Sequence, residues 1–202
     1  MSIEFLLTSL IVVLAPGTGV IYTLASGLGL GLRGSVFAAV GCTLGVLPQF
    51  VATLLGLAAI VHASALAFMV LKYAGAAYLL YLAWCAWRES GALSVGGAQQ
   101  DRRMWRVLRR GITLNLLNPK LSIFFLAFLP QFIDPAAAPV PQMIPLGAVF
   151  IAMTLVVFLI YGALASLART YVIEQPTVMK VLRRSFALAF AGLGVRLAFA
   201  GR

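Results

Sequence analysis

Long apolar runs separated by short polar links cover the whole sequence. A helix that crosses the hydrocarbon core of a membrane needs about 20 mostly apolar residues. The runs show no apolar–polar alternation of the kind found in membrane-spanning β-strands. The pattern therefore predicts an all-α integral membrane protein with six transmembrane helices, at Ile3–Ala25, Ser35–Val61, Leu66–Trp87, Gly111–Ile133, Met143–Leu167 and Phe186–Ala200.

Two of these runs carry helix-breaking residues near their middle. The stretch "LAPGTGVIYTLASG" (residues 14–27) contains Pro16 and Gly17, and "LNLLNPKLSIFF" (residues 114–125) contains Asn118 and Pro119. Proline removes a backbone N–H and frees carbonyl groups in the preceding turn. At membrane depth such groups are tolerated only inside protein or beside a wet cavity. The first and fourth helices are therefore predicted to break there, although ordinary proline kinks remain an alternative.

The two interrupted runs occupy corresponding places in two halves of the chain. A Gly- and Ser-rich link, 89–110, separates residues 1–88 from residues 111–202, and each half holds three runs. Because three is odd, a repeated second half lies upside down relative to the first. Paired interruptions in inverted repeats are the best sequence indication of a transporter binding site. We therefore expect one transmembrane domain over residues 1–202, built from two inverted three-helix repeats.

Polar residues near the breaks are the candidate substrate-binding groups. Asn118 is a good N-cap and Pro119 a favoured first residue for a helix whose free N–H groups would attract a carboxylate. Pro16, Gly17 and Thr18 form the equivalent start in the first run. Lys120 is the only basic residue well inside a run, so it either meets substrate or extends towards the inner membrane surface. Hydrogen bonds to a zwitterion are expected from Thr43, Gln49 and Asn115.

Composition and charge fit this picture. Hydrophobic residues make up 62% of the 202 residues and charged residues 10%, against roughly 45–50% and 25% in soluble domains. The net charge of +10 would suggest nucleic acid in a soluble protein. Here, however, most basic residues lie at Arg33, in 88–110 and in 169–184. Cytoplasmic loops collect Lys and Arg, so these links are predicted to be cytoplasmic, both termini outside, and nucleic acid is not an expected partner.

Three stretches together resemble one family. "APGTGVIYTLASGLGLGLRGSVFAAVGCTLG", "LKYAGAAYLLYLAW" and "NLLNPKLSIFFLAFLPQFI" resemble the LysE/RhtB superfamily of bacterial amino-acid exporters, in order and over essentially the whole chain. The resemblance implies export of amino acids or close derivatives across the bacterial plasma membrane, driven by the proton-motive force. Family members usually carry PGP and a polar residue in the first span. Pro16 and Gly17 match this pattern, while Thr18 and Gly19 depart from it.

The acidic residues restrict the substrate. All of them are placed at the ends of runs or in links, at Glu4, Glu89, Asp101, Asp134 and Glu174. A cationic side chain in the membrane interior is costly without a fixed carboxylate, and Lys120 would repel it and attract a carboxylate. A neutral or zwitterionic amino acid is therefore expected. A non-transporting membrane scaffold, or an exporter of a cationic amino acid or another small metabolite, remains as an alternative.

Other motifs favour no further chemistry. The single His62 and the separate Cys42 and Cys85 suggest no metal site or disulfide, so no cofactor is expected. An enzyme would need a nucleophile–base pair or a metal constellation that the sequence does not offer. "GLGLRG" (residues 29–34) is interpreted as a cytoplasmic turn. Gly41 and Gly45 form a GxxxG motif for close helix packing, either inside the chain or at the seam of a homodimer.

Overall fold

The computed structural model describes residues 2–63, 103–134 and 137–167, with scattered positions between 69 and 84 and between 184 and 198. Every regular element in these residues is helical, which confirms the predicted all-α class. Most of the third and sixth predicted spans, and residues 89–102 of the link, lie outside the described residues. The arrangement of all six spans as inverted repeats therefore remains a prediction.

The first predicted span is divided at its proline. Helix α1 (Ile3–Leu14) begins at the N-cap Ser2, whose hydroxyl accepts a 3.2 Å hydrogen bond from the Phe5 amide. Ala15 then adopts an extended conformation (φ −60°, ψ 133°), because the ring of a following proline disfavours helical dihedrals. Helix α2 (Thr18–Ala63) starts directly after Gly17. The predicted break at Pro16 and Gly17 is confirmed.

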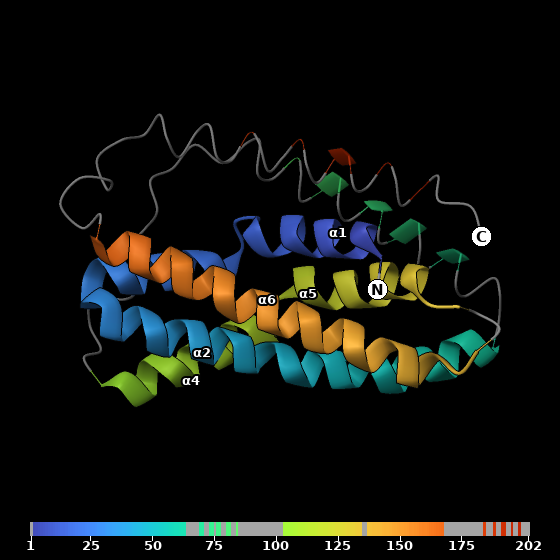
Figure 1. The fold of residues 1–202 in the computed structure, drawn as a ribbon, viewed down its shortest axis with the longest axis horizontal. Coiled ribbons are helices and arrows are strands. Elements are labelled where there is room, and N and C mark those ends of the chain that lie inside the picture. The colour runs from blue at the N-terminus through green and yellow to red at the C-terminus, as the bar shows by residue number, and fades with distance from the viewer. Residues whose placement is uncertain are drawn as a thin grey trace.

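Helix α2 folds back on itself at Gly31. This residue has φ 72° and ψ −167° inside an otherwise helical segment, a conformation that glycine adopts without steric penalty. The two arms then run side by side, and the Cys42 thiol lies 3.8 Å from the Gly19 carbonyl (Figure 1). The turn falls within the predicted stretch 29–34. It occupies a single residue, however, so the helical arms extend beyond the predicted limits at Ala25 and Ser35.

The fourth predicted span is also broken. Helix α4 (Met104–Leu116) is followed by helix α5 (Pro119–Ile123), a π-helical turn η2 (Phe124–Phe128) and a 3₁₀ turn η3 (Leu129–Phe132). The segments before and after the break meet at an angle of 46°, so the predicted break at Asn118 and Pro119 is confirmed. Helix α4 begins at Met104, before the predicted start of the span at Gly111, so the last part of the predicted link is helical.

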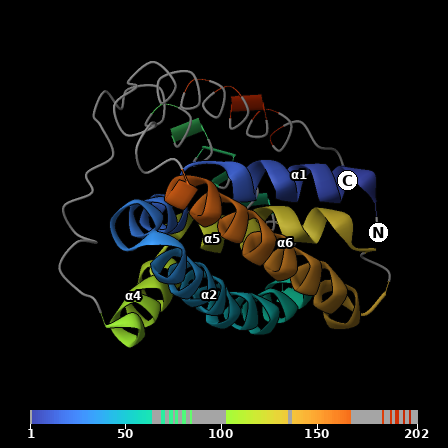
Figure 2. The ribbon, with the colours of Figure 1, turned by 60° about the vertical axis from the view of Figure 1, so that its left-hand side comes forward.

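Helix α6 (Pro139–Leu167) packs against both arms of helix α2 (Figure 2). By length and composition, Thr18–Gly56 and Pro139–Leu167 are apolar enough to cross a membrane, and the bent pair Met104–Leu116 and Pro119–Phe132 adds a third candidate. Helix α1 is a shorter apolar helix. These described helices support a membrane location.

The GxxxG motif lies between helices α2 and α4 of the same chain. A Cβ atom added to Gly45 would lie 2.5 Å from the Ile112 carbonyl oxygen, and one added to Gly41 would overlap the Leu108 carbonyl. Small residues allow two helix backbones to approach this closely. The motif therefore makes a contact inside the chain, the first of the two interpretations given above. A homodimer remains a prediction.

Candidate functional site

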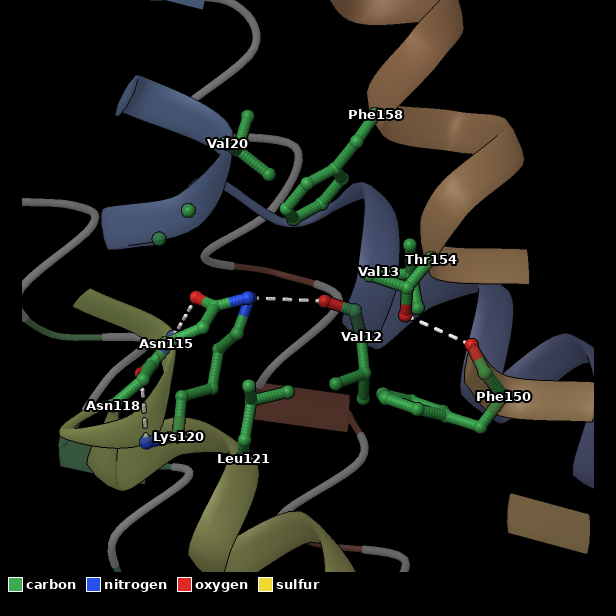
Figure 3. A pocket seen from close by; sticks show the side chains of 12 residues that line it. Val12, Val13, Val20, Asn115, Asn118, Lys120, Leu121, Phe150, Thr154 and Phe158 are labelled. Carbon is green, nitrogen blue, oxygen red and sulfur yellow. Dashed lines mark hydrogen bonds between the residues drawn. The ribbon is translucent and has the colours of Figure 1, made fainter. Parts of the chain in front are cut away.

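The two breaks lie against each other in the middle of the bundle. The Lys120 ammonium, at the start of helix α5, donates hydrogen bonds to the carbonyl oxygens of Val12 and Ala15, each 3.0 Å long (Figure 3). In an uninterrupted helix the Val12 carbonyl would accept from the amide four residues later, which is Pro16 and has no N–H. Lys120 therefore replaces the hydrogen bond that Pro16 removes, and joins the two breaks directly.

The Lys120 charge is held at the end of helix α1. The residue is only 8% exposed, so the expectation that it extends towards the membrane surface is wrong. Its position is favourable because the C-terminal end of a helix carries partial negative charge. Gly17 leaves room for it, since a Cβ atom there would lie 3.0 Å from Lys120 Nζ. Whether Lys120 also contacts substrate remains a prediction.

Two further side chains satisfy carbonyl groups freed at the breaks. The Tyr161 hydroxyl of helix α6 donates to the Leu14 carbonyl at 2.9 Å. At the second break, Gln49 Nε2 of helix α2 donates to the carbonyls of Leu116 (2.6 Å) and Asn118 (3.2 Å). At each break, a side chain from the other half of the chain thus donates a hydrogen bond to the backbone carbonyls at the end of the helix. A buried carbonyl left without such a partner would cost about 1–3 kcal/mol.

Asn118 caps helix α5 as predicted. Its Oδ1 accepts from the Lys120 amide (3.1 Å), and its own carbonyl accepts from the Leu121 amide (3.2 Å). Its Nδ2 donates to Asn115 Oδ1 (3.3 Å), while Asn115 Nδ2 donates to the Cys42 carbonyl (2.9 Å). The first amides of helix α5 therefore already have partners. The expectation that these amides are free to bind a carboxylate is wrong, because they donate to the side-chain and backbone carbonyl oxygens of Asn118.

The start of helix α2 offers the positive helix end instead. The Ile21 amide donates to the Gly17 carbonyl at 2.9 Å, which is the first i to i−4 bond at this end. The amides of Thr18, Gly19 and Val20 precede it and have no carbonyl within their own helix to bind. A helix end of this kind favours an anion. This end faces a cavity between the two breaks, which is lined in part by Gly17, Gly19 and Val20.

A small cavity lies where the two breaks meet. Its volume is about 10 Å³, close to the smallest cavity that holds one water molecule. Its polar wall contains Lys120, the two asparagines and the glycines of the first break, and its remaining wall is mostly apolar (Figure 3). The lining residues are Val12, Val13, Gly17, Gly19, Val20, Asn115, Asn118, Lys120, Leu121, Phe150, Thr154 and Phe158.

The cavity brings together four of the nine predicted site residues, Gly17, Asn115, Asn118 and Lys120. The other five lie outside its lining. Pro16 and Pro119 shape the breaks, and Thr18 is exposed. Thr43 is buried, and its hydroxyl donates to the Ala39 carbonyl of its own helix at 2.8 Å. Gln49 binds the end of helix α4, as described above. Substrate contact by any of the nine remains a prediction.

Most of the apolar lining was not predicted from the sequence. Phe150, Thr154 and Phe158 come from helix α6 and face the breaks from one side (Figure 3). Helix α6 contains no interruption near these residues. In a sequence, an apolar side chain that faces a cavity cannot be distinguished from one that faces lipid. Thr154 was the only available signal, as a polar residue in an apolar run.

Comparison with known proteins identifies the family. The sequence model of the LysE type translocator family matches residues 10–201. The chain belongs to the LysE-type translocators. A Salmonella typhimurium protein named homoserine/homoserine lactone efflux protein is 37% identical over 97% of this chain and 95% of its own length. A Vibrio cholerae protein described as an uncharacterized membrane protein is 35% identical over 98% of this chain and 96% of its own.

A leucine efflux protein from Enterobacter sp. strain 638 is 28% identical over 93% of this chain and 90% of its own length. No solved structure matches this LysE-type translocator. The family confirms the resemblance drawn from the sequence and makes the protein a membrane translocator with relatives named amino-acid efflux proteins.

Proposed function

We propose that this LysE-type translocator exports neutral or zwitterionic amino acids, or close derivatives, across the bacterial plasma membrane, driven by the proton-motive force. The observation that carries the proposal is the cavity between the two breaks. It places the end of helix α1, the start of helix α2 and the Lys120 ammonium around one small space. Opposed helix ends of this kind bind charged substrate groups in other secondary transporters.

The cavity walls match the two parts of an amino acid. The start of helix α2 supplies backbone amides and positive potential for a carboxylate, and Asn115 and Asn118 line the same cavity. The apolar side chains of Val20, Leu121, Phe150 and Phe158 line the same cavity, the last two from helix α6, and offer a surface for an uncharged side chain. We therefore place the substrate carboxylate beside the first turn of helix α2, with its side chain towards helix α6.

The charges of the cavity disfavour a cationic side chain. None of the described lining residues is acidic, and Lys120 is basic. A second cation would lack a counter-charge in a site where an unpaired charge costs several kcal/mol. The relatives named for homoserine and leucine efflux handle amino acids with uncharged side chains, which supports the same substrate class.

Export from preloaded cells tests this function. Cells with and without the gene are loaded with radiolabelled threonine, homoserine, leucine, lysine or arginine, and release is followed over time. Faster release of one or more neutral amino acids is expected, with no faster release of lysine or arginine. Preferential export of lysine or arginine would favour the cationic alternative, and no change for any amino acid would favour a scaffold or another metabolite.

The orientation is proposed from the distribution of basic residues. With the basic links at Arg33, in 88–110 and in 169–184 on the cytoplasmic side, both termini lie outside. A cysteine replacing Ser94, in a variant lacking Cys42 and Cys85, should resist an impermeant thiol reagent added to whole cells and react after the cells are opened. A cysteine added at the N-terminus is the matched control and should react in both conditions. Reaction of the Ser94→Cys variant in whole cells would reverse the orientation.

A further inference from the structure

We infer that the Lys120 ammonium occupies the subsite of the substrate's α-ammonium group, and that the substrate displaces it together with its proton. The inference rests on the proposed function and adds to it the recognition of the amino group and the residue that carries the coupling proton. In the sequence all five acidic residues stand at the ends of apolar runs or in the links between them, and none of the described residues that line the cavity is acidic.

The geometry at the end of helix α1 suits a primary ammonium group. Two carbonyl oxygens, those of Val12 and Ala15, converge on one nitrogen at 3.0 Å each. The α-ammonium of an amino acid has the same charge and the same three N–H donors as the lysine ammonium. In secondary transporters, the C-terminal ends of broken helices commonly hold the coupling cation. In this structure the cation at that position belongs to the protein itself.

The substrate carboxylate fits the other side of the same break. The amides of helix α2 that have no partner within their own helix begin at Thr18, three residues after the Ala15 carbonyl. An amino acid carries its ammonium and carboxylate groups on neighbouring carbon atoms, so one molecule presents both charges at the same break. With the carboxylate at the start of helix α2, the α-ammonium is directed to the carbonyls that Lys120 holds.

The available space points to the same exchange. The cavity is small, and Lys120 forms part of its wall. Lysine has a flexible four-carbon stem, whereas the carbonyls of Val12 and Ala15 that it binds are fixed at the end of helix α1. Withdrawal of the lysine side chain therefore enlarges the cavity and frees the two acceptors in one movement.

No other titratable side chain lines this cavity among the described residues. The titratable groups on the neighbouring helices have partners elsewhere: the Tyr161 hydroxyl donates to Leu14, and the Tyr22 hydroxyl donates to Val107 at 2.9 Å. The Arg110 guanidinium lies over the Tyr22 ring, 5.9 Å from its centre. The Cys42 thiol faces the Gly19 carbonyl. The acidic residue of helix α1, Glu4, is in its first turn, at the opposite end from Val12.

Among the residues that the structure describes, the displaced ammonium therefore finds no carboxylate in this cavity to pair with. Two ammonium groups in one low-dielectric cavity repel each other, which favours the neutral form of one of them. Lys120 transfers its proton to water on the cytoplasmic side as substrate binds, and its nitrogen keeps the electron pair. After the substrate leaves on the outer side, Lys120 takes up a proton there and returns to the carbonyls. One proton enters for each amino acid exported.

Proton release by the purified wild-type protein tests this exchange. Detergent-solubilised protein in weakly buffered solution, at a pH where Lys120 is protonated, is mixed with an exported amino acid and a pH-indicator dye. Linkage between substrate and proton predicts release of about one proton per substrate bound. Substrate binding without release would overturn the inference.

Variants locate the proton. In proteoliposomes, Lys120→Met should retain exchange of internal for external amino acid, while uptake driven by a pH gradient falls by roughly tenfold or more, because its cavity has no group to protonate. The matched control, Arg109→Met, removes an exposed cation of helix α4 and should keep both activities. If Lys120→Met keeps gradient-driven transport, or releases protons on binding like the wild type, another group carries the proton.

Failure of the inference differs from failure of the proposed function. If the wild-type protein neither binds nor exchanges any neutral amino acid, the proposed function is wrong. If the wild-type protein exchanges amino acids but Lys120→Met is correctly folded and binds none, Lys120 holds the substrate and is not displaced by it. The measurement of proton release by the wild-type protein shows whether substrate binding displaces a proton, even if the Lys120→Met variant does not fold.

Discussion

Replacing Asn118 with alanine is expected to abolish efflux while the protein still reaches the membrane. The substitution removes the cap of helix α5, its hydrogen bond from the Lys120 amide and its contact with Asn115. Loss of a cap costs about 0.5–2 kcal/mol, which is small beside the packing of the whole bundle. The same change releases the backbone that positions Lys120. Efflux from preloaded cells and the amount of protein in isolated membranes are the two measurements.

Asn118→Ser is the matched comparison. Serine keeps a side-chain oxygen that caps the helix but cannot reach Asn115 as the longer amide does. We expect it to retain a measurable part of the efflux that the alanine variant loses. Unchanged efflux in Asn118→Ala would show that the second break is an ordinary proline kink without a role in transport.

Replacing Gly41 with valine is expected to prevent stable folding. A side chain at this position meets the Leu108 backbone carbonyl of helix α4, and backbone atoms cannot move aside as a flexible side chain can. Helices α2 and α4 would separate, which removes the alignment of the second break with the first. We expect little protein in the membrane and early loss of the monodisperse peak in size-exclusion chromatography on heating.

Gly56→Ala is the control for this change. The position lies in the same helix, and among the described residues an added Cβ atom would meet nothing within 4 Å outside its own helix. Its expression and thermal stability should match those of the wild type. A Gly41→Val variant with wild-type stability would show that the close approach of helices α2 and α4 is not required for the fold.

The features predicted from sequence are those that follow from local chemistry. Pro16 and Pro119 each lack an N–H, so the positions of the breaks follow from single residues. The cap by Asn118 is likewise a contact between neighbours in the chain. Gly31 was located within a six-residue stretch, but the sequence did not show that one residue with positive φ would make the entire reversal and leave both arms helical.

The remaining features depend on contacts between distant residues. Nothing near Tyr161 or Gln49 indicates which broken helix its side chain completes. The walls contributed by Phe150 and Phe158 are hidden because every face of an apolar span has the same composition. Lys120 was correctly placed at the second break, but its acceptors, the carbonyls of Val12 and Ala15, belong to a helix more than a hundred residues earlier. A backbone carbonyl carries no sequence signal of its own.

A cysteine in the wall of the cavity between the two breaks tests whether the substrate binds in that cavity. Thr154 lines the cavity, and its hydroxyl bonds only its own helix, at the Phe150 carbonyl. A Thr154→Cys variant in a background without Cys42 and Cys85 is treated with a small thiol reagent in membranes, with and without an exported amino acid. Thr113→Cys, on the exposed face of helix α4, serves as control.

We expect the exported amino acid to slow labelling at position 154 in proportion to its occupancy of the site, and lysine to leave this labelling unchanged. Labelling at position 113 should be unaffected by either amino acid. If an amino acid that the protein demonstrably exports leaves labelling at position 154 unchanged at saturating concentration, the substrate binds elsewhere and not in the cavity between the two breaks.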